Sequence, residues 1–267
     1  MFYRCTDKGA PHYKSTLLDN VPHGFSTRHG GVSTGEFTRS MNLAFKRGDD
    51  DETVRRNFEI FAETIGADPK CGIMLGQIHS SDVLTVTKSE FGLGIYKKSD
   101  ICLDGYASNT KGALLCVRVA DCVPVLLADT ENNVISALHS GWRPSVKKIS
   151  AVGVKKMCEL GAFPDKIKVA IGPSICKDCY SVGKDFTDEC ENSLGKEMCR
   201  EFISEKDGIY YADLKRLIYL TLVEAGIREE NIDISEKCTC CEPEEFFSHR
   251  FHKNNRGTMC AMIALPT

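Results

Sequence analysis

The chain has 267 residues, of which 42% are hydrophobic and 27% are charged, a composition typical of soluble globular proteins. Its formal net charge of −3 leaves no excess of basic residues to neutralise a phosphate backbone, which argues against a nucleic-acid polymer as partner. No apolar stretch approaches the ~20 residues of a membrane span, and residues 1–15 lack the apolar core of a signal peptide, so we expect a cytoplasmic protein without a membrane partner.

A loop and then a helix are the first elements that the sequence predicts. Residues 24–50 are rich in Gly, Ser, Thr, Asn and Asp and predict a long loop, which compact domains seldom keep unless it binds something. A helix is expected at about 51–65, because its apolar residues recur at helical spacing and Gly66 follows its last turn.

Apolar runs of strand length come next, at residues 83–87, 113–119, 123–128 and 134–138. A turn at 131–133 joins the last two into a predicted hairpin. A second helix is predicted at about 145–160, with Pro144 at its start and Gly161 at its end. Beyond it we expect a strand at 167–171, helices near 185–205 and at 213–225, and strands near 232–234 and 258–264.

Strands and helices are mixed here without regular β-α-β alternation, which indicates an α+β fold with mixed β-sheets flanked by helices. No repeat, low-complexity segment or linker interrupts the pattern. We therefore expect one continuous domain over residues 1–267.

Three residues at the margins of apolar, strand-like segments are candidate metal ligands: His79, Cys122 and His139. Two histidines and a cysteine are a plausible zinc shell, and three protein ligands leave a fourth position open, as in catalytic zinc sites. Spacing alone is weak support, because neither gap is a local zinc motif. Two core histidines and a buried thiol explain the same residues.

The same atoms also allow a different chemistry. Cys122 could be a nucleophile and His139 its base, with Asp121 or Asp104 orienting the imidazole. A neighbouring imidazolium would lower the pKa of the thiol, as a nucleophilic cysteine requires. The sequence does not separate a metal-bound thiolate from a catalytic one.

Several motifs in order along the chain resemble the YfiH family, also called the polyphenol oxidase or laccase-domain family. The matching segments are HGFSTRHGGVS (23–33), SMNLAFKRGDD (40–50), LGQIHSSDV (75–83), DGYASN (104–109), RVADCVPVLLAD (118–129), SALHSGWR (136–143), AIGPSICKDCYSVG (170–183), CTCCEPEEFFSHR (238–250) and RGTM (256–259). The resemblance runs nearly end to end and implies a layered sandwich. It also implies that His79, Cys122 and His139 are zinc ligands.

Members of this family are described as zinc-containing purine nucleoside phosphorylases that act on adenosine, inosine and methylthioadenosine. Adenosine deamination is attributed to the same pocket. The resemblance thus implies a purine nucleoside and phosphate as substrates. Two departures stand out: Pro144 follows the GWR motif where the family usually has Gly, and His249 and Phe251 alter the C-terminal motif.

Phosphorolysis needs cationic donors for the phosphate and a proton source for the departing base. Arg28, Arg143 and Arg250 lie inside the matching motifs, and a guanidinium group suits an oxyanion. We expect Arg28 and Arg143 to be catalytic and all three arginines to bind substrate.

Three polar residues carry further expectations. Asp104 and Asp121 are candidates for general acid/base catalysis, for hydrogen bonds to a ligating imidazole, or for simple caps and turns. Asn42 is expected to bind the ribose or, alternatively, to hold the 24–50 loop.

Fourteen cysteines in a chain without a secretion signal indicate reduced thiols or metal ligands rather than disulfides. Cys176 and Cys179, together with Cys238, Cys240 and Cys241, could supply a four-thiolate structural zinc site, or they are ordinary thiols.

Three other functions remain open. They are a cysteine hydrolase that uses Cys122 and His139, a copper-dependent polyphenol oxidase, and a non-enzymatic zinc-binding partner protein. Seven histidines argue against a multicopper cluster. The oligomeric state is expected to be a monomer or a small homo-oligomer.

Overall fold

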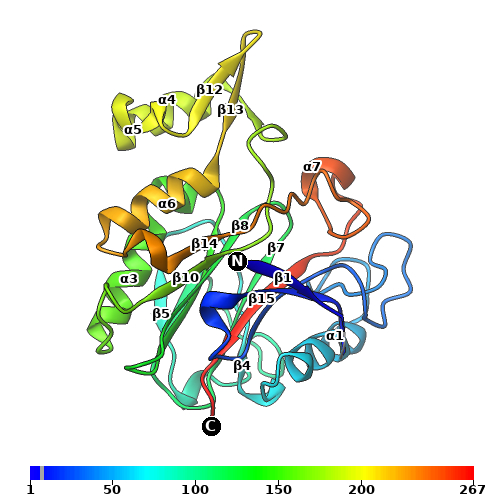
Figure 1. The fold of residues 1–267 in the computed structure, drawn as a ribbon. Coiled ribbons are helices and arrows are strands. Elements are labelled where there is room, and N and C mark those ends of the chain that lie inside the picture. Colours follow the sequence, from blue (N-terminus) through cyan, green and yellow to red (C-terminus); the bar gives the residue numbers. More distant parts are fainter. Residues whose placement is uncertain (7–8) are drawn as a thin grey trace.

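Two mixed β-sheets form the centre of the structure, a computed structural model that describes residues 1–6 and 9–267 (Figure 1). The first sheet has the strand order β1 (Phe2–Cys5), β2 (His12–Ser15), β3 (His23–Ser26), β15 (Met259–Ala264), β7 (Leu114–Val119) and β4 (Gly72–Ile73). The second has the order β14 (Ile232–Ile234), β10 (Lys168–Ile171), β8 (Val123–Asp129), β9 (Val134–Ser140), β6 (Gly105–Ser108) and β5 (Val83–Thr85).

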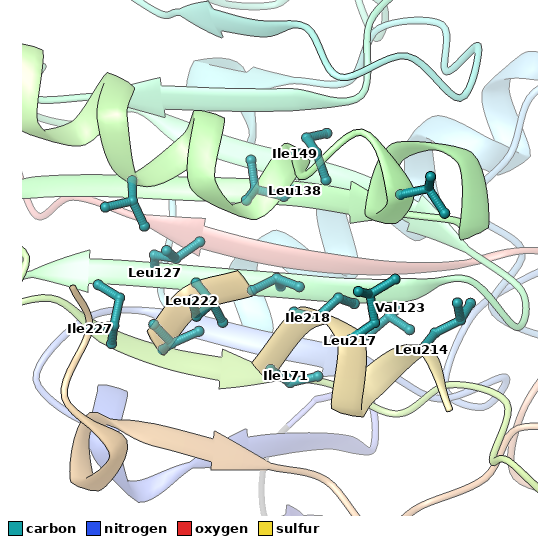
Figure 2. Close-up of a cluster of buried hydrophobic side chains, with 14 of the residues drawn as sticks. Val123, Leu127, Leu138, Ile149, Ile171, Leu214, Leu217, Ile218, Leu222 and Ile227 are labelled. Carbon is teal, nitrogen blue, oxygen red and sulfur yellow. The ribbon is translucent and has the colours of Figure 1, made fainter. Parts of the chain in front are cut away.

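Helices cover the outer face of each sheet. Helix α1 (Asp51–Thr64) packs on the first sheet, and α3 (Ile149–Glu159) and α6 (Leu214–Glu224) pack on the second. Figure 2 shows Leu217, Ile218 and Leu222 of α6 over Val123 and Leu127 of the second sheet. The molecule is therefore a helix–sheet–sheet–helix sandwich.

The central strands read as continuous apolar runs because both of their faces are buried. Along β7, Leu115 and Val117 point into the core between the two sheets. Leu114 and Cys116 point to the opposite face, into the core that includes α1. Successive side chains of a strand therefore point alternately into the two layers on either side of the sheet.

A third, smaller sheet has the order β11 (Ser181–Val182), β13 (Ile209–Ala212) and β12 (Ile203–Lys206). It lies beside α4 (Lys184–Leu194) and α5 (Lys196–Arg200), at one end of the molecule in Figure 1. The remaining helices are α2 (Trp142–Val146), α7 (His249–His252) and the short 3-10 helices η1 (Thr16–Leu18), η2 (Pro69–Cys71), η3 (Lys88–Glu90) and η4 (Glu229–Asn231). In the described part of the chain, no helix has the length and apolar character required to span a bilayer.

The predicted α+β fold with mixed sheets flanked by helices is confirmed, as is the 123–138 hairpin, which is β8 and β9. Two predicted helices are corrected. The helix expected at 145–160 is divided into α2 and α3, because Lys148 has a left-handed backbone conformation (φ 56°). The helical region expected near 185–205 ends in strand β12, which pairs with β13.

Candidate metal centre and cavity

His79, Cys122 and His139 converge at one point in the structure. Their ligand atoms all lie within 4.8 Å of one another. The Cys122 Sγ atom is 3.9 Å from Nε2 of His79, and the two imidazole rings meet edge to face with centroids 4.9 Å apart. Residues separated by 43 and 17 positions in the sequence therefore form one donor set of one sulfur and two ring nitrogens.

The β8–β9 hairpin accounts for two of these positions. Pro124 of β8 lies opposite His139 of β9, so Cys122, just before β8, comes close to the end of β9. His79 comes from the loop between β4 and β5, where it adopts a left-handed backbone conformation with φ 59°. Such a conformation is uncommon for a residue other than glycine, and it clusters at functional sites.

The side chain of Asp104 orients the imidazole of His139. Its Oδ1 atom lies 2.7 Å from Nδ1 of His139, and neither side chain is appreciably exposed. Its Oδ2 atom accepts backbone N–H groups from Ile78 and Ser80, on either side of His79. Asp104 thus orients the ring of His139 directly and holds the backbone on both sides of His79. This is the geometry of a positioning residue.

Cys122 and His139 stabilise each other's charged forms. Burial would raise the pKa of the Cys122 thiol, but the positive charge of His139 and the hydrogen bonds with His139 and His79 together outweigh burial and lower this pKa to about 6. Burial would lower the pKa of His139, but the Cys122 thiolate and the Asp104 carboxylate raise it to about 9. A thiolate is therefore stabilised by positive charge at this point, and a divalent cation can supply that charge.

The donor set and the space around it fit a zinc ion. One thiolate and two imidazoles with room for a fourth ligand are the pattern of catalytic zinc sites. Gly141 lies against the set: a Cβ atom there would be 2.7 Å from Cδ2 of His79 and 3.2 Å from Sγ of Cys122. Only a residue without a side chain leaves the ligands this space.

The three residues line a cavity of about 560 Å³, a size typical of small-molecule sites. Part of its wall is aromatic and comes from Phe45, Trp142 and Tyr180. Trp142 also packs against Phe186, with ring centroids 5.2 Å apart, so it belongs to both the cavity wall and the core.

Four arginines also line the cavity: Arg47, Arg118, Arg250 and Arg256. In the described residues, none of the four forms an ion pair with a carboxylate. Arg118 and Arg250 donate to carbonyl and other neutral oxygens, and the buried Nε of Arg256 has no hydrogen-bond partner in the described structure. The four guanidinium groups outnumber the one carboxylate, Asp121, among the described lining residues, so the cavity holds an excess of positive charge.

Arg250 is the one predicted substrate arginine among the lining residues. Arg28 is not among them: its guanidinium donates to the Pro243 carbonyl at 2.7 Å and stacks on Phe247, 4.8 Å from the ring centroid. Arg143 is exposed, its guanidinium carbon lies 4.1 Å from a ring centroid of Trp142, and it does not line the cavity either. Neither guanidinium group is among the lining residues of this structure, and the substrate-binding and catalytic roles expected of Arg28 and Arg143 stay predictions.

Asn42 is fully buried and does not line the cavity. Its amide donates to the Ala44 carbonyl and to Asp49, and its oxygen accepts the N–H groups of Ala44 and Thr258. Of the two expected roles, the structure shows the one that holds the loop.

Asp121 lines the cavity, whereas Asp104 does not. Both carboxylate oxygens of Asp121 are occupied, by the Thr239 hydroxyl at 2.6 Å and the Arg250 backbone N–H at 2.6 Å. Asp121 is the one carboxylate among the described lining residues, and it connects three segments of the chain, two of which line the cavity.

Arg47, Arg118 and Arg256 were not singled out from the sequence, although each lies within or beside a quoted motif. Arg47 and Arg256 come together because the two loops pair: the N–H of Leu43 donates to the Thr258 carbonyl at 2.8 Å. The signal that could have found them is an arginine next to glycine in two separate loops, Arg47-Gly48 and Arg256-Gly257.

Comparison with known proteins places the chain among relatives of similar length. A family model described as multi-copper polyphenol oxidoreductase laccase matches residues 22–266. A purine nucleoside phosphorylase of Deinococcus radiodurans is 34% identical, over 98% of this chain and 95% of the relative. An adenosine deaminase named RL5, from an unknown prokaryotic organism, is 32% identical over 87% of this chain and 90% of the relative. The crystal structure of Bacillus licheniformis YfiH superposes with a TM-score of 0.90, at 28% identity, and covers 98% of both chains.

Proposed function

The chain belongs to the family described as multi-copper polyphenol oxidoreductase laccase, and from this membership we propose that it is a zinc-dependent purine nucleoside phosphorylase. The substrates are a purine nucleoside, such as adenosine, inosine or methylthioadenosine, and inorganic phosphate. The products are the free base and ribose 1-phosphate. His79, Cys122 and His139 would hold the zinc ion.

The observation that carries this proposal is that the donor set and four arginines without a carboxylate ion pair line one cavity. A deaminase or a cysteine hydrolase has no need of an anion site, whereas a phosphorylase must hold a phosphate dianion against the sugar. Guanidinium groups bind phosphate oxygens with two parallel hydrogen bonds. The cluster therefore favours phosphorolysis over reactions that use water alone.

We assign the following roles to the residues of the cavity and its surroundings. Arg256 and Arg47, at the paired loops, bind the phosphate and stabilise charge at its oxygens during transfer. Phe45, Trp142 and Tyr180 provide aromatic faces for the purine. Asp104 positions His139, and Asp121, which lines the cavity, accepts the backbone N–H of Arg250 and so positions that residue. When bound, the zinc ion supplies Lewis acidity that polarises an electronegative atom of the substrate.

Adenosine deamination is a second candidate activity of the same cavity. It is favoured by the three-donor set, which leaves a coordination position open, and by the 32% identical relative named as an adenosine deaminase. Deamination would proceed without phosphate and would not depend on the arginines.

The family description names copper, and one thiolate with two imidazoles also suits a blue-copper centre. A polyphenol oxidase of the multicopper type also needs a cluster of further histidine ligands, and the seven histidines of the chain argue against one. Zinc is therefore the metal we propose.

The test is an assay of purified, zinc-replete protein with adenosine or inosine, with and without phosphate. Release of the free base that requires phosphate supports the proposal. Absence of base release at any phosphate concentration contradicts it, and production of inosine from adenosine without phosphate would assign the cavity to deamination instead.

A further inference from the structure

A second group of sulfur atoms lies apart from the donor set of the cavity. Cys176 and Cys179 form one Cys-x-x-Cys pair, and Cys238 and Cys241 form another. All four Sγ atoms lie within 4.8 Å of one another. Cys240, the fifth cysteine of the region, is not part of this group.

The second sheet brings the two pairs together. Strands β10 and β14 run parallel, with Ile171 opposite Ile234, so the chain leaves both strands at the same edge of the sheet. The pairing continues beyond the strands, where Ser174 forms a bridge with Cys238 and the Thr239 N–H donates to the Ser174 carbonyl at 3.1 Å. Each Cys-x-x-Cys pair then turns back on itself at the end of this short ladder.

The sulfur spacing is that of a tetrahedral metal site. Four thiolates around a zinc ion at ~2.3 Å would lie about 3.8 Å from one another. The Cys176 and Cys241 Sγ atoms are 4.0 Å apart, and those of Cys179 and Cys241 are 3.3 Å apart. The shorter separation is still far from the ~2.0 Å of a disulfide bond, and all four cysteines are free.

Backbone N–H groups point at one of the sulfurs, as they do around metal-bound thiolates. The Cys238 Sγ atom accepts the N–H of Cys176 at 3.2 Å and the N–H of Cys241 at 3.4 Å. The ammonium group of Lys215 donates to the carbonyls of Ser235 and Lys237 beside the group, and no carboxylate of the described residues pairs with it. A site of four thiolates and one zinc ion carries two negative charges, which this partly buried cation offsets in part.

We propose that Cys176, Cys179, Cys238 and Cys241 form a closed four-thiolate site that binds a second, structural zinc ion. Four protein ligands leave no open position, so this ion takes no part in the chemistry. The inference does not depend on the proposed phosphorylase activity, because it concerns other residues and another role.

The site would stabilise one wall of the cavity. The Cys179 carbonyl accepts a hydrogen bond from the Arg250 guanidinium at 3.0 Å. Thr239, which lies between Cys238 and Cys241, donates to Asp121 at 2.6 Å. The two turns that a zinc ion would join are therefore the ones that position Arg250 and Asp121.

The experiment is elemental analysis of the full chain, purified under reducing conditions, with cobalt substitution as a spectroscopic readout. We expect two zinc ions per chain. The double variant C179S/C241S should retain one zinc ion, and C240S, a matched cysteine between two ligands, should retain two. The cobalt-substituted wild type should show the intense sulfur-to-cobalt charge transfer and visible bands of a four-sulfur tetrahedral site, which Cys122 alone cannot give.

Other results would overturn the inference. One zinc ion per wild-type chain, together with four thiols of the group that react freely with an alkylating reagent, would show that no second ion is bound. Iron in place of zinc would contradict the assignment of the metal. If the double variant does not fold, the stoichiometry and cobalt spectrum of the wild type still decide the question.

Discussion

The Asp104 carboxylate and the His139 imidazole form a buried pair, with 2.7 Å between Oδ1 and Nδ1. Because Nδ1 is occupied in this way, Nε2 is the nitrogen that remains for a metal ion. The second oxygen of the same carboxylate holds the backbone on both sides of His79. A residue that does not line the cavity thus sets the positions of two of the three proposed ligands.

Replacing this carboxylate should weaken zinc binding. Asp104→Asn removes the negative charge behind His139, and its single carbonyl oxygen cannot accept both from the His139 ring and from the Ile78 and Ser80 N–H groups. We expect zinc affinity to fall by about 10- to 100-fold, the usual effect of losing such a partner. Competition with a chromophoric chelator measures it. Asp82→Asn, at an exposed carboxylate nearby, is the control, and equal affinities in the two variants would contradict the role assigned to Asp104.

Arg256 should contribute more to the binding of phosphate than to the binding of the nucleoside. Arg256→Gln removes a charged donor from the cavity, and such a bond contributes about 1.5–3 kcal/mol. We expect the KM for phosphate to rise by about 10- to 100-fold, with little change in the KM for inosine.

The matched control is Arg143→Gln, because Arg143 belongs to a family motif but lies outside the cavity. We expect that variant to keep the wild-type KM for phosphate. If Arg143→Gln raises this KM and Arg256→Gln does not, the anion site has been placed at the wrong arginines.

Chemical reactivity of Cys122 separates a metal ligand from a nucleophile. After zinc is removed by a chelator, iodoacetamide should alkylate Cys122 rapidly at pH 7, because His139 lowers the pKa of this thiol to about 6 despite burial. Zinc-loaded protein should be protected at Cys122, while the exposed Cys102 reacts equally in both forms. Peptide mass spectrometry gives the rates. Fast alkylation of Cys122 in zinc-loaded protein would favour a cysteine hydrolase.

His23 should make the protein less stable in mild acid. Burial lowers its pKa from 6.5 to about 4, and its Nε2 accepts the Ser15 N–H at 3.0 Å as a neutral ring. The unfolded chain binds the proton more tightly, so this stabilisation is complete above about pH 6.5 and is lost as the pH falls to about 4. The loss is on the order of 3 kcal/mol.

Urea unfolding at several pH values tests this expectation with the variant His23→Gln, whose side chain does not titrate. The variant should be less stable than the wild type at pH 7 and should lose less stability between pH 6.5 and 4. His29→Gln, at an exposed histidine, should keep the wild-type slope. An unchanged slope in His23→Gln would show that another group causes the acid sensitivity.

The metal ligands could be predicted from the sequence because local signals surround them. Two apolar runs joined by a turn predict the β8–β9 hairpin, and its register then places Cys122 near His139. His79 is predicted as the third ligand because it lies at the edge of another apolar segment and because the family resemblance implies it.

The anion site could not be predicted in the same way. Arg47 and Arg256 are 209 positions apart in the sequence, and they meet because Leu43 and Asn42 bond to Thr258 across two loops. Neither loop carries a periodic pattern that predicts this pairing. Strands β1 and β2 were missed for a related reason: they are short and partly polar, and pairing with each other and with β3 stabilises them.

Direct detection of the product tests the central claim of phosphorolysis in this cavity. Phosphorus NMR of zinc-loaded protein with inosine and phosphate should show ribose 1-phosphate growing in equal amount to the hypoxanthine released. The His139→Ala variant should form neither. Hypoxanthine accompanied by free ribose, with the phosphate signal unchanged, would contradict the account.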